Sequence, residues 1–382
     1  MHEKKIDLTH GYQYNRISRQ RLYKRMSGER IVKQFFGMSQ SGDLKEAVSG
    51  MSSPQLIILL SNSAQFESHV KTLQGMYPKV PSIGCAGMSY STKIVEKGVS
   101  VVAFYDGVTV AVNVLEQASV MPVKYIRRLE KDVETVRASS KDTVCIDFCS
   151  GNDACVLNTF SSVLKRNGIS LVGGTAEEGK VSVNGTVYTD AAVYALIKNQ
   201  SGRVKAYKEN IYHQKGSARF VASATDKANY MIGQLNGRPA KKVYQELLHI
   251  SEQEIQTQTF KNPFGKINGT DTCIISLKEV NGNALSCFRQ VNDSDVLILL
   301  ELGDYRAIVK RTIQNIYKDF PRISAVFSIN CLFRYLLFNE NHYMQEYLQE
   351  MAALGNHAGV VGYGEHYNNQ FVNQSMTCVV FE

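Results

Sequence analysis

The C-terminal part of the chain gathers side chains that could bind or transform a small molecule. A thiol, a guanidinium, a phenol, a carboxylate and an amide occur there in the order Cys331, Arg334, Tyr363, Glu365 and Asn373. A guanidinium binds a carboxylate through two parallel hydrogen bonds, and a carboxylate accepts hydrogen bonds from an ammonium group. Arg334 and Glu365 would therefore suit a zwitterion. The phenol and the amide would supply the few polar contacts that fix the orientation of a small ligand.

Regular elements must position these side chains. The run VFSINCLFR at 326–334 predicts a buried strand, and LLFNENHYMQEYLQEMAALG follows at helical spacing until Gly355 ends it. A second strand, GVVGYGE, delivers Tyr363 and Glu365 at its end, and a third, SMTCVVF, closes the chain. We therefore expect the candidate residues on one pocket wall.

Other roles for these residues remain open. An unpaired charge after an apolar run is costly, so Arg334 and Glu365 would alternatively pair with each other or lie at an exposed strand end. Cys331 and His366 would form a catalytic pair of a thiolate and a general base. Nothing in the sequence supplies an oxyanion hole, however, and a cysteine after an apolar strand is usually a buried core residue. Arg238, which follows an Asn-Gly turn, is a further candidate ligand-binding residue.

Nucleotide-binding and hydrolase motifs are not supported. GTAEEGK at 174–180 fits a phosphate-binding loop up to its last letter, but Val181 follows where Ser or Thr would hold magnesium. The chain also has no GxGxxG after a strand, and no GxSxG, HExxH or calcium-loop motif. We expect a glycine-rich turn at 174–180, which could still line a cleft.

The eight cysteines predict reduced thiols in a reducing compartment, mostly as small core residues. Their only cluster is Cys145, Cys149 and Cys155, with the spacing C-x3-C-x5-C. Because there is no CxxC pair and no nearby histidine, we expect buried thiols near a strand end, with no metal and no cofactor.

Length and charge bound the remaining classes. A chain of 382 residues suggests two or three domains. Residues 1–33 hold nine Lys or Arg and three Asp or Glu, which is +6 of the total net charge of +8. With no motif or aromatic platform beside it, this tail favours a solvated basic arm, and no nucleic acid partner is expected. No apolar run reaches the roughly 18 residues of a transmembrane segment, and the N-terminus lacks a secretory signal, so we expect a cytoplasmic protein.

Helical and strand patterns alternate along the chain. They predict an α/β (α+β) fold of two layered sheet-and-helix domains with mixed sheets, at 34–215 and 216–382. Residues 98–116 are typical of a β-hairpin, because two β-branched runs flank Asp106-Gly107.

From residue 34 to its end, the chain resembles the FIST domain pair. The C-terminal half carries SATDKANYMIGQLNGRPAKKVYQELL, FSINCLFR, GYGE and FVNQS in the order of the FIST C-terminal domain. In the N-terminal half SIGCAG, ISLVGGTA and NGTVYTDAAVYALI are similar in kind and order to the FIST N-terminal domain.

The resemblance implies an intracellular sensory module for signal transduction that binds a small ligand such as an amino acid. We expect no catalysis, and an output through a signalling partner, a homo-oligomer or the basic tail. Arg334 would bind a carboxylate and Glu365 a cation, with Tyr363, Asn373 and Cys331 shaping the pocket. The alternatives are a cysteine-dependent enzyme acting on a small metabolite through Cys331, or an interaction scaffold that docks through residues 1–33.

Overall fold

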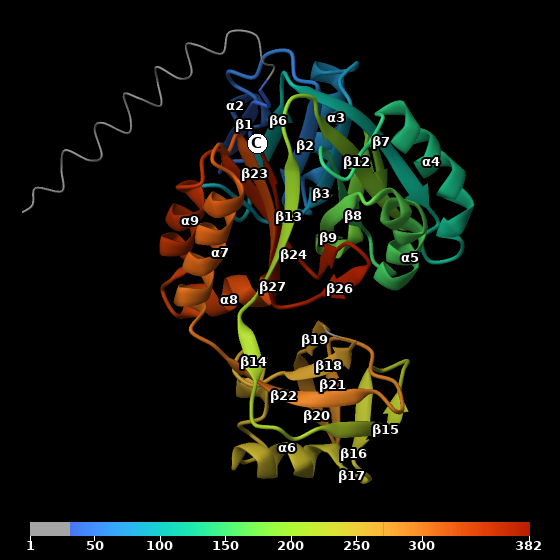
Figure 1. Cartoon of the computed structure of the whole chain (residues 1–382), viewed down its shortest axis with the longest axis vertical. Helices are drawn as coiled ribbons and strands as arrows, with labels where there is room; N and C mark the ends of the chain where they lie inside the picture. Colours follow the sequence, from blue (N-terminus) through green and yellow to red (C-terminus); the bar gives the residue numbers. More distant parts are fainter. Residues whose placement is uncertain (1–30, 270) are drawn as a thin grey trace, which may run out of the picture.

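The computed structural model describes residues 31–269 and 271–382. The predicted basic tail, 1–33, lies outside the described residues except for residues 31–33. Three sheets form an upper body and a fourth forms a lower lobe, which we define as residues 212–302 (Figure 1). The predicted fold class, α/β with mixed sheets, is confirmed.

Within residues 31–269 and 271–382, the three sheets of the upper body have six strands each. The first contains, in spatial order, β1 (Gln34–Ser39), β6 (Val99–Phe104), β2 (Leu56–Ser61), β3 (Ser82–Ala86), β10 (Val181–Val183) and β11 (Thr186–Tyr188). The second contains β7 (Val108–Glu116), β12 (Ala191–Asn199), β8 (Thr143–Cys149), β9 (Ser170–Thr175), β25 (Glu365–Tyr367) and β26 (Gln370–Val372). The third contains β13 (Val204–Asn210), β27 (Ser375–Phe381), β23 (Ala325–Cys331), β24 (His357–Gly362), β4 (Ser89–Tyr90) and β5 (Ile94–Val95).

The same order of elements occurs three times along the chain. Each repeat has a first strand, two parallel strands joined through helix, a short hairpin, and a last strand that pairs between the first strand and the parallel pair. The parallel strands are joined by α3 (Phe66–Met76), by α5 (Asp153–Leu164), and by α8 (Leu332–Glu340) with α9 (Met344–Ala352). The hairpin of each repeat pairs with the sheet of another repeat: β4–β5 with the third sheet, β10–β11 with the first, and β25–β26 with the second. The three sheets are therefore linked in a cycle.

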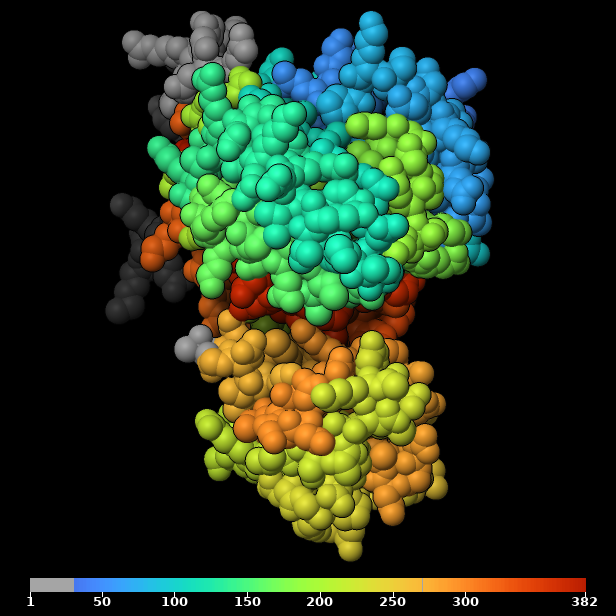
Figure 2. All heavy atoms as spheres, turned by 90° about the vertical axis from the view of Figure 1, so that its right-hand side faces the viewer, coloured from blue at the N-terminus to red at the C-terminus, as the bar shows by residue number. Residues whose placement is uncertain are grey.

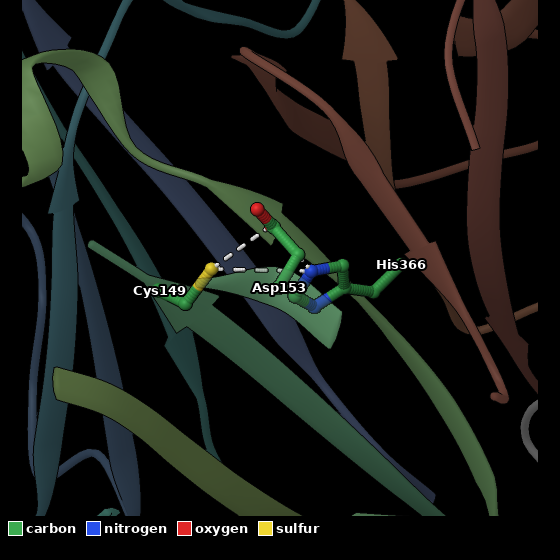
Figure 3. Close-up of side chains that lie close together, drawn as sticks. All are labelled: Cys149, Asp153 and His366. Carbon is green, nitrogen blue, oxygen red and sulfur yellow. Dashed lines mark hydrogen bonds and ion pairs between the residues drawn. The ribbon is translucent and has the colours of Figure 1, made fainter. Parts of the chain in front are cut away.

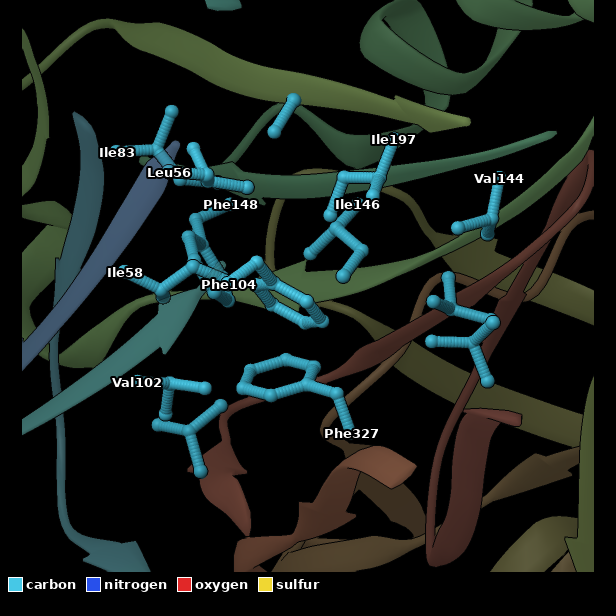
Figure 4. Packing of buried hydrophobic residues seen from close by; sticks show 14 of the residues in the cluster. Leu56, Ile58, Ile83, Val102, Phe104, Val144, Ile146, Phe148, Ile197 and Phe327 are labelled. Carbon is cyan, nitrogen blue, oxygen red and sulfur yellow. The ribbon is translucent and has the colours of Figure 1, made fainter. Parts of the chain in front are cut away.

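The inner faces of the three sheets pack on one another. Phe104, Phe148 and Phe327, one from each sheet, belong to the same buried cluster (Figure 4). Strand β2, LIILLS, is buried along its whole length. Because successive side chains of a strand point to opposite faces, Leu56 and Ile58 face this central cluster, whereas Ile57 packs in the layer that contains α3. Continuous apolar runs are expected for strands covered on both faces.

Helices cover the outer faces of these sheets (Figure 1). Besides α3, α5, α8 and α9, they are α2 (Leu44–Ala47), α4 (Ile126–Thr135) and α7 (Tyr305–Asp319). Within the described residues, no helix is both long and apolar enough to cross a membrane.

The lower lobe is inserted into the third repeat, between β13 and α7. Its strands are β14 (Tyr212–Gln214), β15 (Phe220–Asp226), β16 (Met231–Leu235), β17 (Arg238–Pro239), β18 (Phe264–Asn268), β19 (Asp271–Ile275), β20 (Leu277–Asn281), β21 (Ala284–Cys287) and β22 (Val296–Leu302). Its one long helix among the described residues is α6 (Ala240–Leu248), which packs on a separate apolar core. Strands from before and after residue 215 share two sheets of the upper body, and the boundaries at 33 and 215 stay predictions.

Two local predictions are wrong. The runs flanking Asp106-Gly107 do not pair as a hairpin, because β6 pairs with β1 and β2 while β7 pairs with β12. Gly107 does adopt a positive φ of 80°, but the turn carries the chain from the first sheet to the second. The predicted helix at 336–355 is two helices, and it begins earlier: β23 ends at Cys331, and α8 and α9 are separated near His342, which has a positive φ of 54°.

Candidate functional site

Strand β25 carries two polar residues with opposite orientations. Glu365 and His366 are consecutive, so their side chains point to opposite sides of the strand. Glu365 reaches Ser375 at the start of β27, whereas His366 reaches Asp147 on β8. Both side chains are fully buried. We call the two groups that they organise the Glu365 cluster (Glu365, Cys331, Ser375) and the His366 cluster (His366, Asp147, Cys149, Asp153, Thr175).

In the Glu365 cluster, one carboxyl oxygen is satisfied and the other is not. Oε2 accepts from the hydroxyl of Ser375 at 2.9 Å and from its backbone N–H at 3.4 Å. Oε1 has no hydrogen-bond partner among the described residues. Burial raises the pKa of Glu365 to about 8, although hydrogen bonds from Ser375 and the Cys331 thiol lower it. The carboxyl group therefore changes its charge near neutral pH.

Arg334 adopts neither of the arrangements expected from the sequence. It lies in the first turn of α8, fully buried, and forms an ion pair with Glu209 on β13. Its guanidinium also lies over the rings of Phe338 and Tyr347, 4.6 and 5.5 Å from their centroids. The alternatives of mutual pairing with Glu365 and of an exposed strand end are both wrong. Nε and Nη1 of Arg334 have no partner among the described residues.

Three other predicted site residues, Cys331, Asn373 and Tyr363, differ in their burial. Cys331 is buried beside Glu365, and burial raises the pKa of its thiol well above the usual value, with a further contribution from Glu365. Asn373 is buried next to the Gly364 backbone. Tyr363 is half-exposed, and its hydroxyl donates to Glu177 at 3.1 Å.

Arg238 is not brought to this region. It lies on β17 in the lower lobe, where its exposed guanidinium forms two hydrogen bonds to Glu246, at 2.8 and 2.6 Å. Of the residues expected on one pocket wall, Cys331 and Glu365 lie in contact, whereas Arg334 is paired with Glu209, and the pocket itself stays a prediction.

The His366 cluster brings together groups that the sequence separates by more than 200 residues (Figure 3). Nδ1 of His366 lies 2.8 Å from Oδ2 of Asp147, and Nε2 lies 2.9 Å from Oδ1 of Asp153. The Cys149 thiol lies 3.3 Å from the same Asp153 oxygen and 3.9 Å from Nε2. The hydroxyl of Thr175 donates to Asp153 at 2.5 Å. The thiol neighbour of His366 is therefore Cys149, and the alternative pair of Cys331 with His366, which the sequence already disfavoured, does not form.

Charge in this cluster is concentrated on the histidine and the carboxylates. Burial alone would lower the pKa of His366, but Asp147 and other neighbours raise it well above its usual value. Burial would raise the pKa of Asp153, but the hydrogen bonds from His366 and Thr175 lower it to about 2. Burial raises the pKa of the Cys149 thiol to about 11, although His366 opposes this change. The group therefore favours an imidazolium between two carboxylates over a thiolate with a free base.

Residue types at equivalent positions of the three sheets show that this chemistry is confined to one of them. In each sheet, a glycine of the second parallel strand lies between a residue of the first parallel strand and a residue of the paired hairpin. In that order, the residues are Leu59, Gly84 and Ser182 in the first sheet, Asp147, Gly173 and His366 in the second, and Ser328, Gly359 and Tyr90 in the third. Glycine is required in the second sheet, since a Cβ atom at Gly173 would lie 1.9 Å from Oδ1 of Asp147. The Asp and His combination occurs there and not at the other two positions.

Family models match most of the chain. The FIST N domain matches residues 55–238, and the FIST C domain matches residues 240–368. This chain belongs to the FIST family. FIST domains are associated with sensing in signal transduction. A comparison with curated proteins finds no match.

The two clusters of this FIST protein lie close to the lower lobe. The hairpin β25–β26 and the segment after it contact the lobe through side chains of both parts: Gln370 donates to Asp271, Arg289 donates to the backbone oxygen of Phe371, and Gln374 donates to Ser276 at 2.7 Å. In Figure 2 the C-terminal residues, in red, occupy the waist between the upper body and the lobe. The candidate site therefore lies at the junction of the two parts.

Sequence reasoning missed Glu209, Asp147, Asp153 and Cys149 as site residues. Asp147 and Glu209 each interrupt an apolar or alternating strand pattern, in TVCIDFC and VKAYKEN. A charged residue inside a strand that is otherwise buried costs free energy unless it is paired. The interruption of the apolar pattern could have identified Asp147 as a buried, paired residue. Its partner His366 could not be identified from the sequence, because the two meet only through the pairing of the β25–β26 hairpin with the second sheet.

Proposed function

We propose that this protein is an intracellular sensory module that binds a small polar, amino-acid-like ligand at the Glu365 cluster. Binding is relayed through a conformational change or a partner contact, without transformation of the ligand. The ligand contacts Glu365, Cys331 and Asn373, with Tyr363 at the exposed edge. Arg334 contributes positive charge through the guanidinium nitrogens that Glu209 leaves unbonded. Membership of the FIST family supports this role.

The observation that carries the proposal is a group of buried polar atoms without partners. Oε1 of Glu365, Oε1 of Gln374 and both amide atoms of Asn330 have no hydrogen-bond partner among the described residues. Asn330 precedes Cys331 at the end of β23, and Gln374 precedes Ser375 at the start of β27. Roughly 90% or more of buried polar groups in proteins are hydrogen-bonded, so the unsatisfied Oε1 of Glu365 beside Cys331 supports binding of a polar molecule, whereas the side chain of Asn330 points to the opposite face of β23 from Cys331.

The relay is supported by the place of Gln374. Its amide nitrogen donates to Ser276 and to the backbone oxygen of Thr259, both in the lower lobe, while its amide oxygen is unbonded. A ligand that hydrogen-bonds this oxygen acts on a side chain that already holds the lobe. A ligand shifts a conformational equilibrium only through its different affinity for the two states, and contact with a junction residue provides such a difference.

A binding role is favoured over the alternative of a cysteine-dependent enzyme. The thiolate is the nucleophilic form of cysteine, and burial raises the thiol pKa at both Cys331 and Cys149. The second nitrogen of His366 is also occupied by Asp153, so this histidine is not placed as a free base for either thiol. The alternative of a scaffold that docks through residues 1–33 stays a proposal, because residues 1–30 of this segment lie outside the described residues.

A thermal-shift screen against amino acids and organic acids tests the proposal. A ligand at 100-fold over its dissociation constant adds about 2.7 kcal/mol to the free energy of unfolding. Glu365→Gln should weaken binding of the hit, because a neutral amide of the same size replaces a carboxyl group that can ionise when a cationic ligand binds. Arg238→Ala is the matched control, because it removes an exposed charge that lies away from the cluster. Equal affinity of the parent and Glu365→Gln for every hit would place the ligand elsewhere, and rapid loss of the hit in a turnover assay would favour the enzyme.

A further inference from the structure

We propose that the His366 cluster is a binding site for a divalent transition metal of the zinc class. The ligands are Sγ of Cys149, Oδ1 of Asp153 and Nε2 of His366, with a fourth position left for water or a small molecule. Among the described residues, these three form the only group of at least three Cys, His, Asp or Glu whose ligand atoms lie within 4.8 Å of one another. The inference does not rest on the proposed function, because His366 and Glu365 point to opposite sides of β25.

The triangle of ligand atoms has the size of a tetrahedral site. With zinc at about 2.3 Å from sulfur and about 2.0–2.2 Å from nitrogen and oxygen, tetrahedral angles separate the ligand atoms by about 3.4–3.6 Å. The observed separations are 3.3 Å for Sγ to Oδ1, 3.9 Å for Sγ to Nε2 and 2.9 Å for Oδ1 to Nε2. Each edge therefore differs from the tetrahedral value by no more than about 0.5 Å, which side-chain rotation can supply.

The ligand types fit the same metals. Thiolate and imidazole favour zinc and related ions, and carboxylate oxygen is also a zinc ligand, whereas calcium and magnesium prefer oxygen ligands alone. Three protein ligands and one open position are typical of zinc sites that bind a further molecule. Cys149 and His366 are buried, and Asp153 keeps 16% of its side chain exposed, so the open position is reached from the Asp153 side.

The surroundings of His366 orient its imidazole ring as a metal site requires. A histidine ligand usually donates its other ring N–H to a carboxylate or carbonyl group, which fixes the tautomer and the ring orientation. Here Nδ1 lies 2.8 Å from Oδ2 of Asp147, so Nε2 is directed at Cys149 and Asp153. Gly173 leaves room for the Asp147 carboxylate, and Phe371 packs against the imidazole at a centroid distance of 6.0 Å. The ring is thus held from both sides.

The repeats provide an internal comparison. Cys149 lies two residues after Asp147, and the equivalent residues of the other two sheets are Ser61 and Asn330. Neither equivalent position offers a thiolate with an imidazole. A ligand set that occurs at one of three equivalent positions is not explained by the common requirements of the fold, which all three share.

Cobalt titration of the purified full-length protein tests the site. Protein stripped with a chelator and kept reduced is titrated with Co²⁺, which gives a near-ultraviolet absorption band when a thiolate binds it. We expect the band to saturate at one Co²⁺ per chain and to disappear when Zn²⁺ is added. Cys149→Ser should abolish the band. Cys155→Ser, which removes an exposed thiol six residues away, should leave it unchanged.

Two further variants keep the test decisive if Cys149→Ser does not fold. His366→Gln should weaken Zn²⁺ binding while leaving Cys149 in place. Asp147→Asn should weaken it about 10–100-fold and retain the thiolate band, because Asp147 orients a ligand without binding the metal. Far-UV circular dichroism of each metal-free variant checks its fold. The absence of a thiolate band in the parent, or a band that persists in Cys149→Ser or is lost in Cys155→Ser, would overturn the proposal.

Discussion

The buried carboxyl group of Glu365 should make the stability of this protein fall as the pH rises through neutrality. Its pKa is about 8 in the folded protein, against an ordinary value of 4.5. A carboxyl group whose pKa is raised by folding contributes stability that is fully present below the unfolded pKa and is lost as the pH rises through the folded pKa. The relevant window is therefore pH 4.5 to 8, and the loss occurs because the carboxyl group ionises in the unfolded chain, whereas burial keeps it protonated in the folded protein.

The magnitude follows from the difference between the two pKa values. Each pKa unit corresponds to about 1.36 kcal/mol, so the raised pKa of Glu365 corresponds to a loss of up to about 5 kcal/mol across the window. Glu365→Gln has nearly the same shape and does not titrate. The parent and the variant should therefore have similar free energies of unfolding near pH 4.5, and the variant should become progressively more stable than the parent up to about pH 9.

Urea unfolding followed by far-UV circular dichroism measures this difference, and the method suits a chain without tryptophan. The parent, Glu365→Gln and Glu279→Gln are compared at several values from pH 4.5 to pH 9. Glu279 is an exposed residue of β20, so its substitution should leave the pH profile of the parent unchanged. Profiles of the parent and Glu365→Gln that run parallel across the window would refute the reasoning, because they would show that the carboxyl group does not titrate differently in the folded protein.

Three other outcomes are expected from the packing. Arg334→Met removes one member of a fully buried ion pair and should lower the free energy of unfolding by about 3–5 kcal/mol, measured in urea; a loss below about 1 kcal/mol would contradict the buried pair. Gly173→Ala places a methyl group against backbone and carboxylate atoms of β8 and should lower the free energy of unfolding by about 1–3 kcal/mol or more. Gly75→Ala on α3, where the new methyl group meets nothing within 4 Å, should raise the free energy of unfolding by about 0.5–1 kcal/mol. Equal melting temperatures of the two variants would argue against this packing. A thiol reagent should modify Cys155 rapidly in the folded protein and the buried cysteines only on unfolding, so a fast phase that survives Cys155→Ser would show a second accessible thiol.

Much of the secondary structure follows from local sequence patterns. Unbroken runs of apolar residues are typical of strands buried on both faces and predict strands at 55–60, 143–150 and 375–381, which are β2, β8 and β27. The turn predicted at 174–180 also forms, and a strand follows it, as expected when Val181 stands where a phosphate-binding loop has Ser or Thr.

The connections between sheets could not be predicted in the same way. The Asp106-Gly107 turn has a local pattern that favours a hairpin, but β6 already has a partner strand on each side, β1 and β2. Strand β7 pairs instead with β12, some 80 residues later in the chain, in the register from Val108 with Asn199 to Glu116 with Ala191. One feature of the sequence is compatible with this outcome. The β6 sequence, VSVVAF, does not alternate between apolar and polar residues, as expected for a strand inside a sheet, and all six of its residues are buried, whereas an isolated hairpin exposes one face.

The candidate site illustrates the same division between local and long-range information. The sequence identified Cys331 and Glu365, which meet although Cys331 ends β23 of the third sheet and Glu365 begins β25 in the second. It could not identify the partners of Arg334 and His366, since Glu209 and Asp147 lie 125 and 219 positions away along the chain. The first pairing depends on β13 lying beside β27, and the second on a hairpin of the third repeat joining the sheet of the second.

We expect the position of β25 to couple the two proposed sites. This three-residue strand lies between β9 and β26, and β26 is tied to the lower lobe through the bond from Arg289 to the backbone oxygen of Phe371. A metal held through His366 fixes one side of the strand, and a ligand held through Glu365 acts on the other side of the same backbone. By linkage, any factor by which bound Zn²⁺ changes the affinity for the ligand must equal the factor by which the ligand changes the affinity for Zn²⁺. Titration of Zn²⁺ with and without the ligand, and of the ligand with and without Zn²⁺, measures both factors. If neither affinity changes, β25 transmits nothing between its two sides.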